Sequence, residues 1–478
     1  MTLITLVIGA IIYGALQLLP RERTEDEKAI KRSLELAVVQ LNALPPAPKL
    51  TVIAQAIVVA PSAQEVIARN AKLRSGDIAN FRQALTRAIA NFEVGIGSDR
   101  EILSVLRTVD RPYEAMLVPL NKWVAENTAD SIYAAHIARA HTRRKFAWHA
   151  RGTDYIPYTH QQNFTELSKW NKLSVEDYVA AIPKSKHPIN ATASLIYDTI
   201  DYSHAALKDK LYKSGEKIFP ASEALFTQYS ASLMHENGGG SIPAAQAFLV
   251  RATKNGVPED VRESLAQQLA NIYANNYKIR EYQGDLNYTI EQTKQKDDSG
   301  TWLARAKEER RTKLFDDALT STQRALKHNP AFDKALAEQF YILFQLNRPE
   351  EAKAARRLAA DLGSNWAQAQ IIDDMMWERN GETRDWVKIR AECEASAAML
   401  NPRGQTCMGG MITDGVAGFT RDNAKEIAWY ELAARQGDSK AQYTTMAGCF
   451  TKAWEPNKIK KKVFSTLETP LAKALTWR

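Results

Sequence analysis

One stretch of the chain, residues 404–443, constrains the fold more than any other. It consists of a short helical segment, a turn that contains glycine, and an amphipathic helix that ends at Gly437, after which the pattern starts again. Asp422 is placed to cap the second helix, because its carboxylate can accept from the unpaired N–H groups of the first turn. Gly437 supplies the left-handed residue that commonly ends a helix, and Gly409 lets a neighbouring helix approach closely. The stretch therefore predicts a helix–turn–helix unit that buries its apolar face by stacking on further units.

The spacing of glycines, aromatics and alanines in this unit resembles the Sel-1-like repeat, a relative of the tetratricopeptide repeat. The chain departs from that pattern at Gly404, where the family has alanine, in a turn that is one residue longer, and at Met446, where glycine is expected. The resemblance implies an α-solenoid whose concave face binds another protein. The residues that stand in the family's places are Gly404, Met408, Gly409, Gly415, Asp422, Lys425, Trp429, Tyr430, Ala433, Ala434, Gly437 and Ala441.

Weaker copies of the unit precede this stretch, because residues 318–332 and 348–363 are typical of tetratricopeptide helices. We expect residues 296–478 to form a solenoid of three or four units. The alternative is an irregular helical bundle with a coincidental period. Breaks spaced in the 30s, as in repeats of this class, fall at Pro330, Gly363, Asn401 and Gly437.

Residues 2–19 carry no charge, and Arg21 follows the run almost at once. A helix of that length spans about 27 Å, close to the hydrocarbon thickness of a bilayer. No basic residue precedes the run and no small-residue cleavage site follows it, as a signal peptide would require. We therefore expect residues 1–20 to be a single-pass membrane anchor, with a buried core helix as the alternative.

The side of the membrane that holds the body is a separate question. The basic residues after the span would leave the body in the cytoplasm under the positive-inside rule. Bacterial envelope proteins with similar repeats usually have a periplasmic body. On that resemblance we expect a bacterial inner-membrane protein with its body in the periplasm, and the cytoplasm is the alternative.

Net charge and cysteine content argue against a nucleic-acid-binding protein and against a disulfide-rich scaffold. A net charge of +8 over 478 residues is modest: it is compatible with an anionic surface or an acidic partner, but no nucleic acid is expected. Three cysteines, Cys393, Cys407 and Cys449, do not make a disulfide-dense scaffold. We interpret them as buried small apolar residues. The alternative is one disulfide in an oxidising compartment, with Cys407 as a member.

The rest of the chain also predicts helices, so the expected fold class is all-α. Residues 21–60 are interpreted as a linker helix followed by a stiff proline-rich spacer, and residues 61–295 as a helical domain of unknown function. Ser62 and Glu65 form a capping box at the first helix of that domain. Residues 51–60 are ambiguous between a strand and a buried helix.

The middle of this domain carries a further motif. Its arrangement, a tryptophan followed about 25 residues later by AW-x-ARG, resembles an uncharacterised bacterial family that is labelled as a domain of unknown function and is usually helical. The resemblance covers residues 70–290 and implies no activity. The residues that carry it are Trp123, Ala147, Trp148, Ala150, Arg151 and Gly152.

Four histidines of this region, His136, His141, His149 and His160, fall within 25 residues. The first two are five residues apart, whereas zinc ligands on one helix are three or four apart. We expect histidines that face solvent or are bonded structurally, and neither a metal nor a cofactor.

A basic run overlaps these histidines and is interleaved with Phe146 and Trp148. Such a mixture can hold the phosphate groups of a lipid or a nucleic acid. The alternative is a solvated helix face, with Arg151 holding the turn through a buried salt bridge. The candidate anion-binding residues are Arg143, Arg144, Lys145 and Arg151.

The function that these features favour is a non-enzymatic scaffold, tethered to a bacterial membrane, that binds another protein. Three further functions stay open. The resemblance to envelope repeat proteins implies an immunity protein that neutralises a secreted antibacterial toxin such as a lipase, or an adaptor for an envelope component; the basic region allows an enzyme with its site near residues 136–151. Solenoid faces bind through a few aromatic anchors, and packing between repeats is the alternative role of the candidates, Trp366, Trp377, Trp386 and Tyr430.

Overall fold

The described part of the chain is helical and contains no strand, which confirms the all-α prediction. None of its helices combines the length and the apolar character that crossing a bilayer requires. Residues 2–19, where the anchor is predicted, and residues 51–59 lie outside the described ranges. The computed structural model describes residues 25–45, 60–109, 111–129, 131–152, 161–201, 205–231, 233, 242–259, 261–263, 266 and 286–450.

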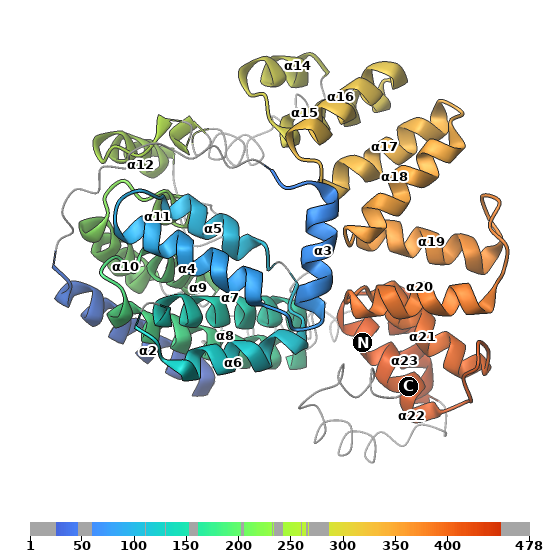
Figure 1. Cartoon of the computed structure of the whole chain (residues 1–478), viewed down its shortest axis with the longest axis horizontal. Coiled ribbons are helices and arrows are strands. Elements are labelled where there is room, and N and C mark those ends of the chain that lie inside the picture. Colours follow the sequence, from blue (N-terminus) through green and yellow to red (C-terminus); the bar gives the residue numbers. More distant parts are fainter. Residues whose placement is uncertain are drawn as a thin grey trace, which may run out of the picture.

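The described helices form two bodies that lie side by side (Figure 1). The first body is built around the antiparallel pair α7 (Ile132–Arg151) and α8 (Gln161–Ala181), which has the most extensive contact among the described helices. Its helices are α2 (Glu25–Ala43), α4 (Ala79–Glu93), α5 (Asp99–Arg107), η1 (Glu114–Met116), α6 (Leu117–Glu126), α7 (Ile132–Arg151), α8 (Gln161–Ala181), η3 (Ile182–Lys184), α9 (Ile189–Asp201), α10 (Ala205–Ile218), α11 (Glu223–Ala231) and α12 (Ile242–Lys254).

Helix α2, interpreted from the sequence as a linker, is part of the core of this body. Its buried residues Ile30, Leu34, Ala37 and Leu41 recur at helical spacing and so form one apolar face. That face packs against α8 and α10. The helix therefore contributes to the hydrophobic core of the first body.

The second body is a stack of antiparallel helix pairs, α15–α16, α17–α18, α19–α20 and α21–α22, followed by α23. Each pair also contacts the next, as one unit must when it cannot bury its apolar face alone. This stack confirms the predicted architecture of Sel-1-like and tetratricopeptide-like repeats. The bounds are α14 (Leu286–Gln295), α15 (Ser299–Arg311), α16 (Phe315–His328), α17 (Asp333–Gln345), α18 (Pro349–Asp361), α19 (Asn365–Trp377), α20 (Trp386–Ala398), α21 (Pro402–Asp414), α22 (Asn423–Arg435) and α23 (Ser439–Phe450).

The local geometry of the last complete pair follows from its sequence. The Asp422 carboxylate accepts from the backbone N–H groups of residues 424 and 425, each at 3.1 Å, and Gly437 has a φ of +87°. At Gly409 a Cβ atom would lie 3.2 Å from the Tyr430 ring. Gly404, the departure from the family pattern, lies so close to α20 that a Cβ would meet the backbone nitrogen of Ala397 at 2.5 Å. Close packing of α20 on α21 thus requires the glycine.

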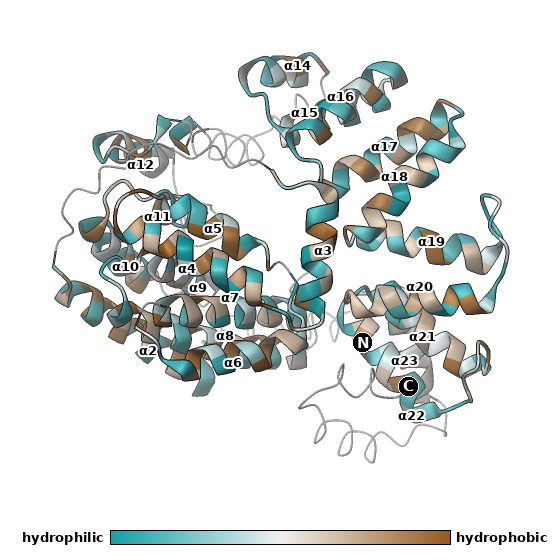
Figure 2. Ribbon diagram, in the orientation of Figure 1, coloured by the Kyte–Doolittle hydropathy of each residue, from teal (hydrophilic) through white to brown (hydrophobic). Residues whose placement is uncertain are grey.

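Helix α3 (Ala63–Arg74) connects the two bodies. Its capping box is formed as predicted, with the Ser62 N–H donating to Glu65 at 2.7 Å. Ala63 and the partly buried Ile67 pack into the apolar core of the solenoid, whereas Leu73 belongs to the core of the first body. Figure 1 shows α3 between the bodies, and Figure 2 shows apolar residues distributed along it. The helix therefore joins the two bodies, because its residues are buried in both hydrophobic cores.

Candidate functional site

The first helices of successive pairs contact one another along the stack, α15 with α17 and α19 with α21. In a solenoid, the helices that approach each other across pairs lie on the inner side of the curve. We call the surface formed by α15, α17, α19 and α21 the inner face. It is an extended surface whose side chains can vary without disturbing the core.

Four aromatic side chains gather on the inner face, Phe340, Tyr341 and Phe344 from α17 and Trp366 from α19. The Trp366 ring centroid lies 5.1 Å from that of Tyr341 and 5.4 Å from that of Phe340. Tyr341 is nevertheless 41% exposed and Phe344 53% exposed. We call these four residues the aromatic cluster. Tyr341 and Phe344 form its exposed half, whereas Phe340 and Trp366 form its packed half.

Two ion pairs lie close to the rings of the aromatic cluster. Arg310 on α15 pairs with Glu338 on α17, and its guanidinium carbon lies 5.6 Å from the Tyr341 ring. Arg356 on α18 is buried, pairs with Asp374 and lies 5.3 Å from the Phe340 ring. The Arg356–Asp374 pair is buried on both sides and fixes the local geometry, because removing one partner leaves an uncompensated charge; Arg310 is partly exposed. The aromatic cluster is therefore presented on a rigid support.

The predicted partner-binding residues take different positions. Trp366 is a member of the aromatic cluster, and Trp377, at the end of the same helix, is 55% exposed. Trp386 begins α20 and packs partly buried against the solenoid core. Tyr430 is buried against Gly409, between α21 and α22. The structure brings none of the other three into the aromatic cluster, and their role in binding a partner stays a prediction.

Tyr341 and Phe344 were not predicted as site residues. The signal was present in the sequence, since three aromatic residues at positions 340, 341 and 344 lie on one face of a helix. Periodicity alone assigns such a face to the core. Only the neighbouring helices show that part of this face is left uncovered.

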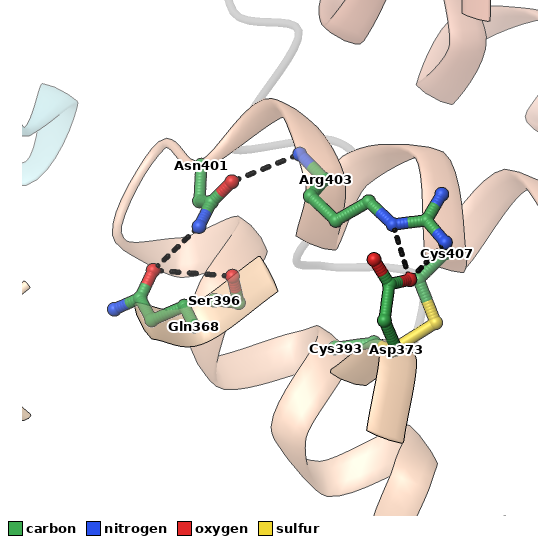
Figure 3. The surroundings of a disulfide bond; sticks show 7 residues. All are labelled: Gln368, Asp373, Cys393, Ser396, Asn401, Arg403 and Cys407. Carbon is green, nitrogen blue, oxygen red and sulfur yellow. Dashed lines mark hydrogen bonds and ion pairs between the residues drawn. A yellow bond between two sulfur atoms is a disulfide. The ribbon is translucent and has the colours of Figure 1, made fainter. Parts of the chain in front are cut away.

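A disulfide between Cys393 and Cys407 joins α20 to α21 (Figure 3). Both residues are buried, but they are bonded to each other, so their interpretation as unpaired small apolar residues was wrong. The side chain of Cys449 lies outside the described residues. The pairing depends on how α20 packs on α21, which spacing alone does not determine.

A buried polar network lies beside the disulfide. The Gln368 Oε1 atom accepts from the Ser396 hydroxyl at 3.2 Å and from the Asn401 amide at 2.9 Å. Nearby, Arg403 Nε donates to Asp373 at 3.0 Å (Figure 3). These bonds link α19, α20 and α21, and so fix the positions of α19 and α21 on the inner face.

The basic run on α7 is largely occupied within the protein. Arg139 donates to Asp177 on α8 at 2.9 and 2.6 Å, and Arg143 donates to it at 2.7 Å. Burial alone would raise the pKa of Asp177, but the neighbouring His136, Arg139 and Arg143 outweigh burial and lower it. Arg144 lies over the Tyr197 ring at 4.0 Å. Binding of an external anion by Arg143 or Arg144 stays a prediction.

The end of α7 meets the solenoid. Arg151 donates to the carbonyl of Gly152 at 3.1 Å and lies 5.7 Å from the Trp148 ring. The Asn163 amide donates both to the Arg151 carbonyl at 3.1 Å and to the Arg435 carbonyl at 3.3 Å. Arg151 thus holds its turn through a carbonyl, without an ion pair among the described residues. The AW-x-ARG motif forms part of the junction between the bodies.

The described histidines are not grouped into a metal site. Among the described residues, no group of three or more His, Cys, Asp or Glu side chains is arranged to hold a metal ion. His136 Nδ1 lies 3.6 Å from Asp177. Burial, with lesser contributions from neighbouring cations, lowers the pKa of His141 to about 3. His160 lies outside the described residues.

Comparison with known proteins finds likeness only among solved structures. No protein-family model and no curated protein matches the chain, so the resemblance of residues 70–290 to an uncharacterised family stays a prediction. A Sel1 repeat protein from Oxalobacter formigenes is 16% identical, with 50% of this chain and 99% of that chain covered and a TM-score of 0.35.

Two further structures span more of this chain. Yeast Tom70 is 12% identical, with 87% of this chain and 85% of that chain covered and a TM-score of 0.37. A circular tandem repeat protein is 11% identical, with 94% of this chain and 99% of that chain covered and a TM-score of 0.15. Scores this low carry no argument about function, which must come from the chain's own contacts.

Proposed function

We propose that this protein is a non-enzymatic scaffold that binds another protein on the inner face of its solenoid. The observation that carries the proposal is the aromatic cluster, in which Tyr341 and Phe344 are exposed beside a rigidly packed Trp366. Exposed apolar residues scattered singly are normal on a protein surface, whereas clustered aromatic anchors are typical of binding sites. The supporting ion pairs lower the entropic cost of binding, because the anchors are already ordered.

Affinity capture with the full-length protein tests this proposal. A Tyr341→Ala/Phe344→Ala double variant removes the exposed half of the aromatic cluster, and Tyr443→Ala removes an aromatic residue of α23 that is 74% exposed. We expect a protein that is retained by the wild type and by Tyr443→Ala, and lost from the double variant. Equal retention by all three proteins would refute the role of the aromatic cluster.

We further propose that residues 2–19 anchor this scaffold in a bacterial inner membrane, with the body in the periplasm. The uncharged run supports the anchor. The Cys393–Cys407 disulfide supports an oxidising compartment. A reporter fused to the C-terminus, active only in the periplasm, tests the topology; activity of a cytoplasmic reporter at the same position would contradict it.

The narrower roles concern the identity of the partner. An immunity protein predicts one tightly bound toxin encoded by a neighbouring gene, whereas an envelope adaptor predicts several weaker partners. Mass spectrometry of the captured proteins separates the two. The enzyme alternative near residues 136–151 loses support where His136, Arg139 and Arg143 are directed to Asp177.

A further inference from the structure

A pocket of about 510 Å³ lies at the junction of the two bodies. The first body supplies Arg111, Lys145, Trp148 and His149, and the solenoid supplies the ends of α20 and α22 and the starts of α19 and α21. Small-molecule sites have volumes of about 300–1,000 Å³ and occur preferentially between domains. Size and position therefore both fit a small ligand.

Among the described residues that line the pocket, Arg111 and Lys145 are cations and none is a carboxylate. The two terminal nitrogens of Arg111 donate to the carbonyls of Gly363 and Met399, which fixes the guanidinium in place. A guanidinium has five N–H donors, so two such bonds leave further donors. The positive potential also acts on His149, since burial lowers the pKa of that histidine to about 4 and Arg111 adds to the shift.

Two ring donors line the same space. Trp148 supplies a flat indole face together with an N–H, and the neutral His149 supplies one donor and one acceptor. Among the described residues neither ring has a hydrogen-bond partner. Met399, Leu400 and Pro402 add apolar surface from the solenoid side. Polar rings that line a pocket without partners are groups that a ligand can satisfy.

We propose that this junction pocket binds a small organic anion that carries a flat ring. The anionic group lies between Arg111 and Lys145, and the ring packs on Trp148 and the apolar residues of the solenoid. Because both bodies form the walls, a bound ligand links them. The pocket is separate from the aromatic cluster, so either proposal can fail without the other.

Ligand-observed NMR titration of the full-length protein tests the pocket. Benzoate and phenyl phosphate serve as ring-bearing anions, acetate and inorganic phosphate as anions without a ring, and benzyl alcohol as a ring without charge. Lys145→Gln removes one cation of the pocket. Arg144→Gln is the matched control, because its cation lies on the next position of α7 over the Tyr197 ring and does not line the pocket.

We expect at least one ring-bearing anion to bind more tightly than acetate, inorganic phosphate and benzyl alcohol. Lys145→Gln should weaken that binding by about tenfold or more, as expected for a charge-assisted hydrogen bond, while Arg144→Gln leaves it unchanged. Binding of benzoate but not phenyl phosphate, or the reverse, identifies the anionic group. Equal binding of the ring-free anions, or equal loss in the two variants, would overturn the proposal.

Discussion

Gly152 offers the sharpest test of how the two bodies are joined. Its φ of +78° and ψ of −172° lie in a region that only glycine occupies readily, so an alanine there costs about 1–3 kcal/mol in backbone strain. An alanine Cβ would also overlap the carbonyl oxygen of Arg435 at the end of α22. That carbonyl would have to move away, which breaks its 3.3 Å hydrogen bond from Asn163 at a cost of about 1 kcal/mol.

Gly256 provides a matched control. Its φ is +75°, but a Cβ at that position would meet nothing within 4 Å. Gly256→Ala therefore carries backbone strain of about 1–2 kcal/mol without a clash. We expect Gly152→Ala to lower the free energy of unfolding by about 3 kcal/mol or more, and to open the junction.

Two measurements separate strain from clash. Denaturant titration gives the free energy of unfolding, and hydrogen exchange reports protection of the amides at the end of α22 and the start of α21. Gly152→Ala should expose these amides, whereas Gly256→Ala should leave them protected. Equal destabilisation by the two variants, with unchanged exchange at α22, would refute the tight approach of α7 to the solenoid.

Three further predictions concern the solenoid and the core of the first body. Replacing Cys393 and Cys407 by alanine, or reducing them, removes a crosslink across 14 residues and should lower the free energy of unfolding of the solenoid by about 3 kcal/mol in denaturant titrations; no change on reduction would contradict the crosslink. Arg356→Leu leaves the buried Asp374 carboxylate without its cation and should cost about 3–5 kcal/mol by the same assay, whereas a loss below about 1 kcal/mol would count against the pair. Because the pKa of His141 falls from 6.5 to about 3 on folding, the unfolded state binds the proton first, so stability is complete above pH 6.5 and declines as the pH falls towards 3. His141→Gln should flatten that decline in thermal melts taken across this range, and an unchanged slope would argue against burial of a neutral imidazole.

Local features of the fold were predictable because their causes are local. The cap at Asp422, the capping box at Ser62 and the left-handed Gly437 depend on residues within one turn of each other. The repeat period was visible for the same reason, since each unit carries its own apolar face and its own break.

Long-range features were not predictable from the same signals. The amphipathic pattern of α3 shows that it buries residues, but not that Ala63 and Leu73 pack into different cores. The bond from Asn163 to the Arg435 carbonyl joins residues 272 positions apart, and nothing in one sequence relates them. The AW-x-ARG motif suggested a domain signature, whereas its glycine lies against the solenoid.

The candidate site was predictable only in part. Trp366 was predicted from its residue type and belongs to the aromatic cluster, whereas Tyr430 matched the repeat pattern and is buried between helices. Residue type predicts that an aromatic side chain stabilises a repeat stack. Whether part of that side chain stays exposed depends on how the neighbouring helix pair packs against it. Phe344 is a side chain that stays exposed.

Site-specific photocrosslinking in cells tests the central claim most directly. A photoreactive amino acid in place of Phe344 reports what touches the inner face, and the same residue in place of Val118, which is 75% exposed on the first body, reports background contacts. Binding at the aromatic cluster predicts a discrete crosslinked protein at position 344 that is absent at position 118. No product at position 344, or the same products at both positions, would contradict it.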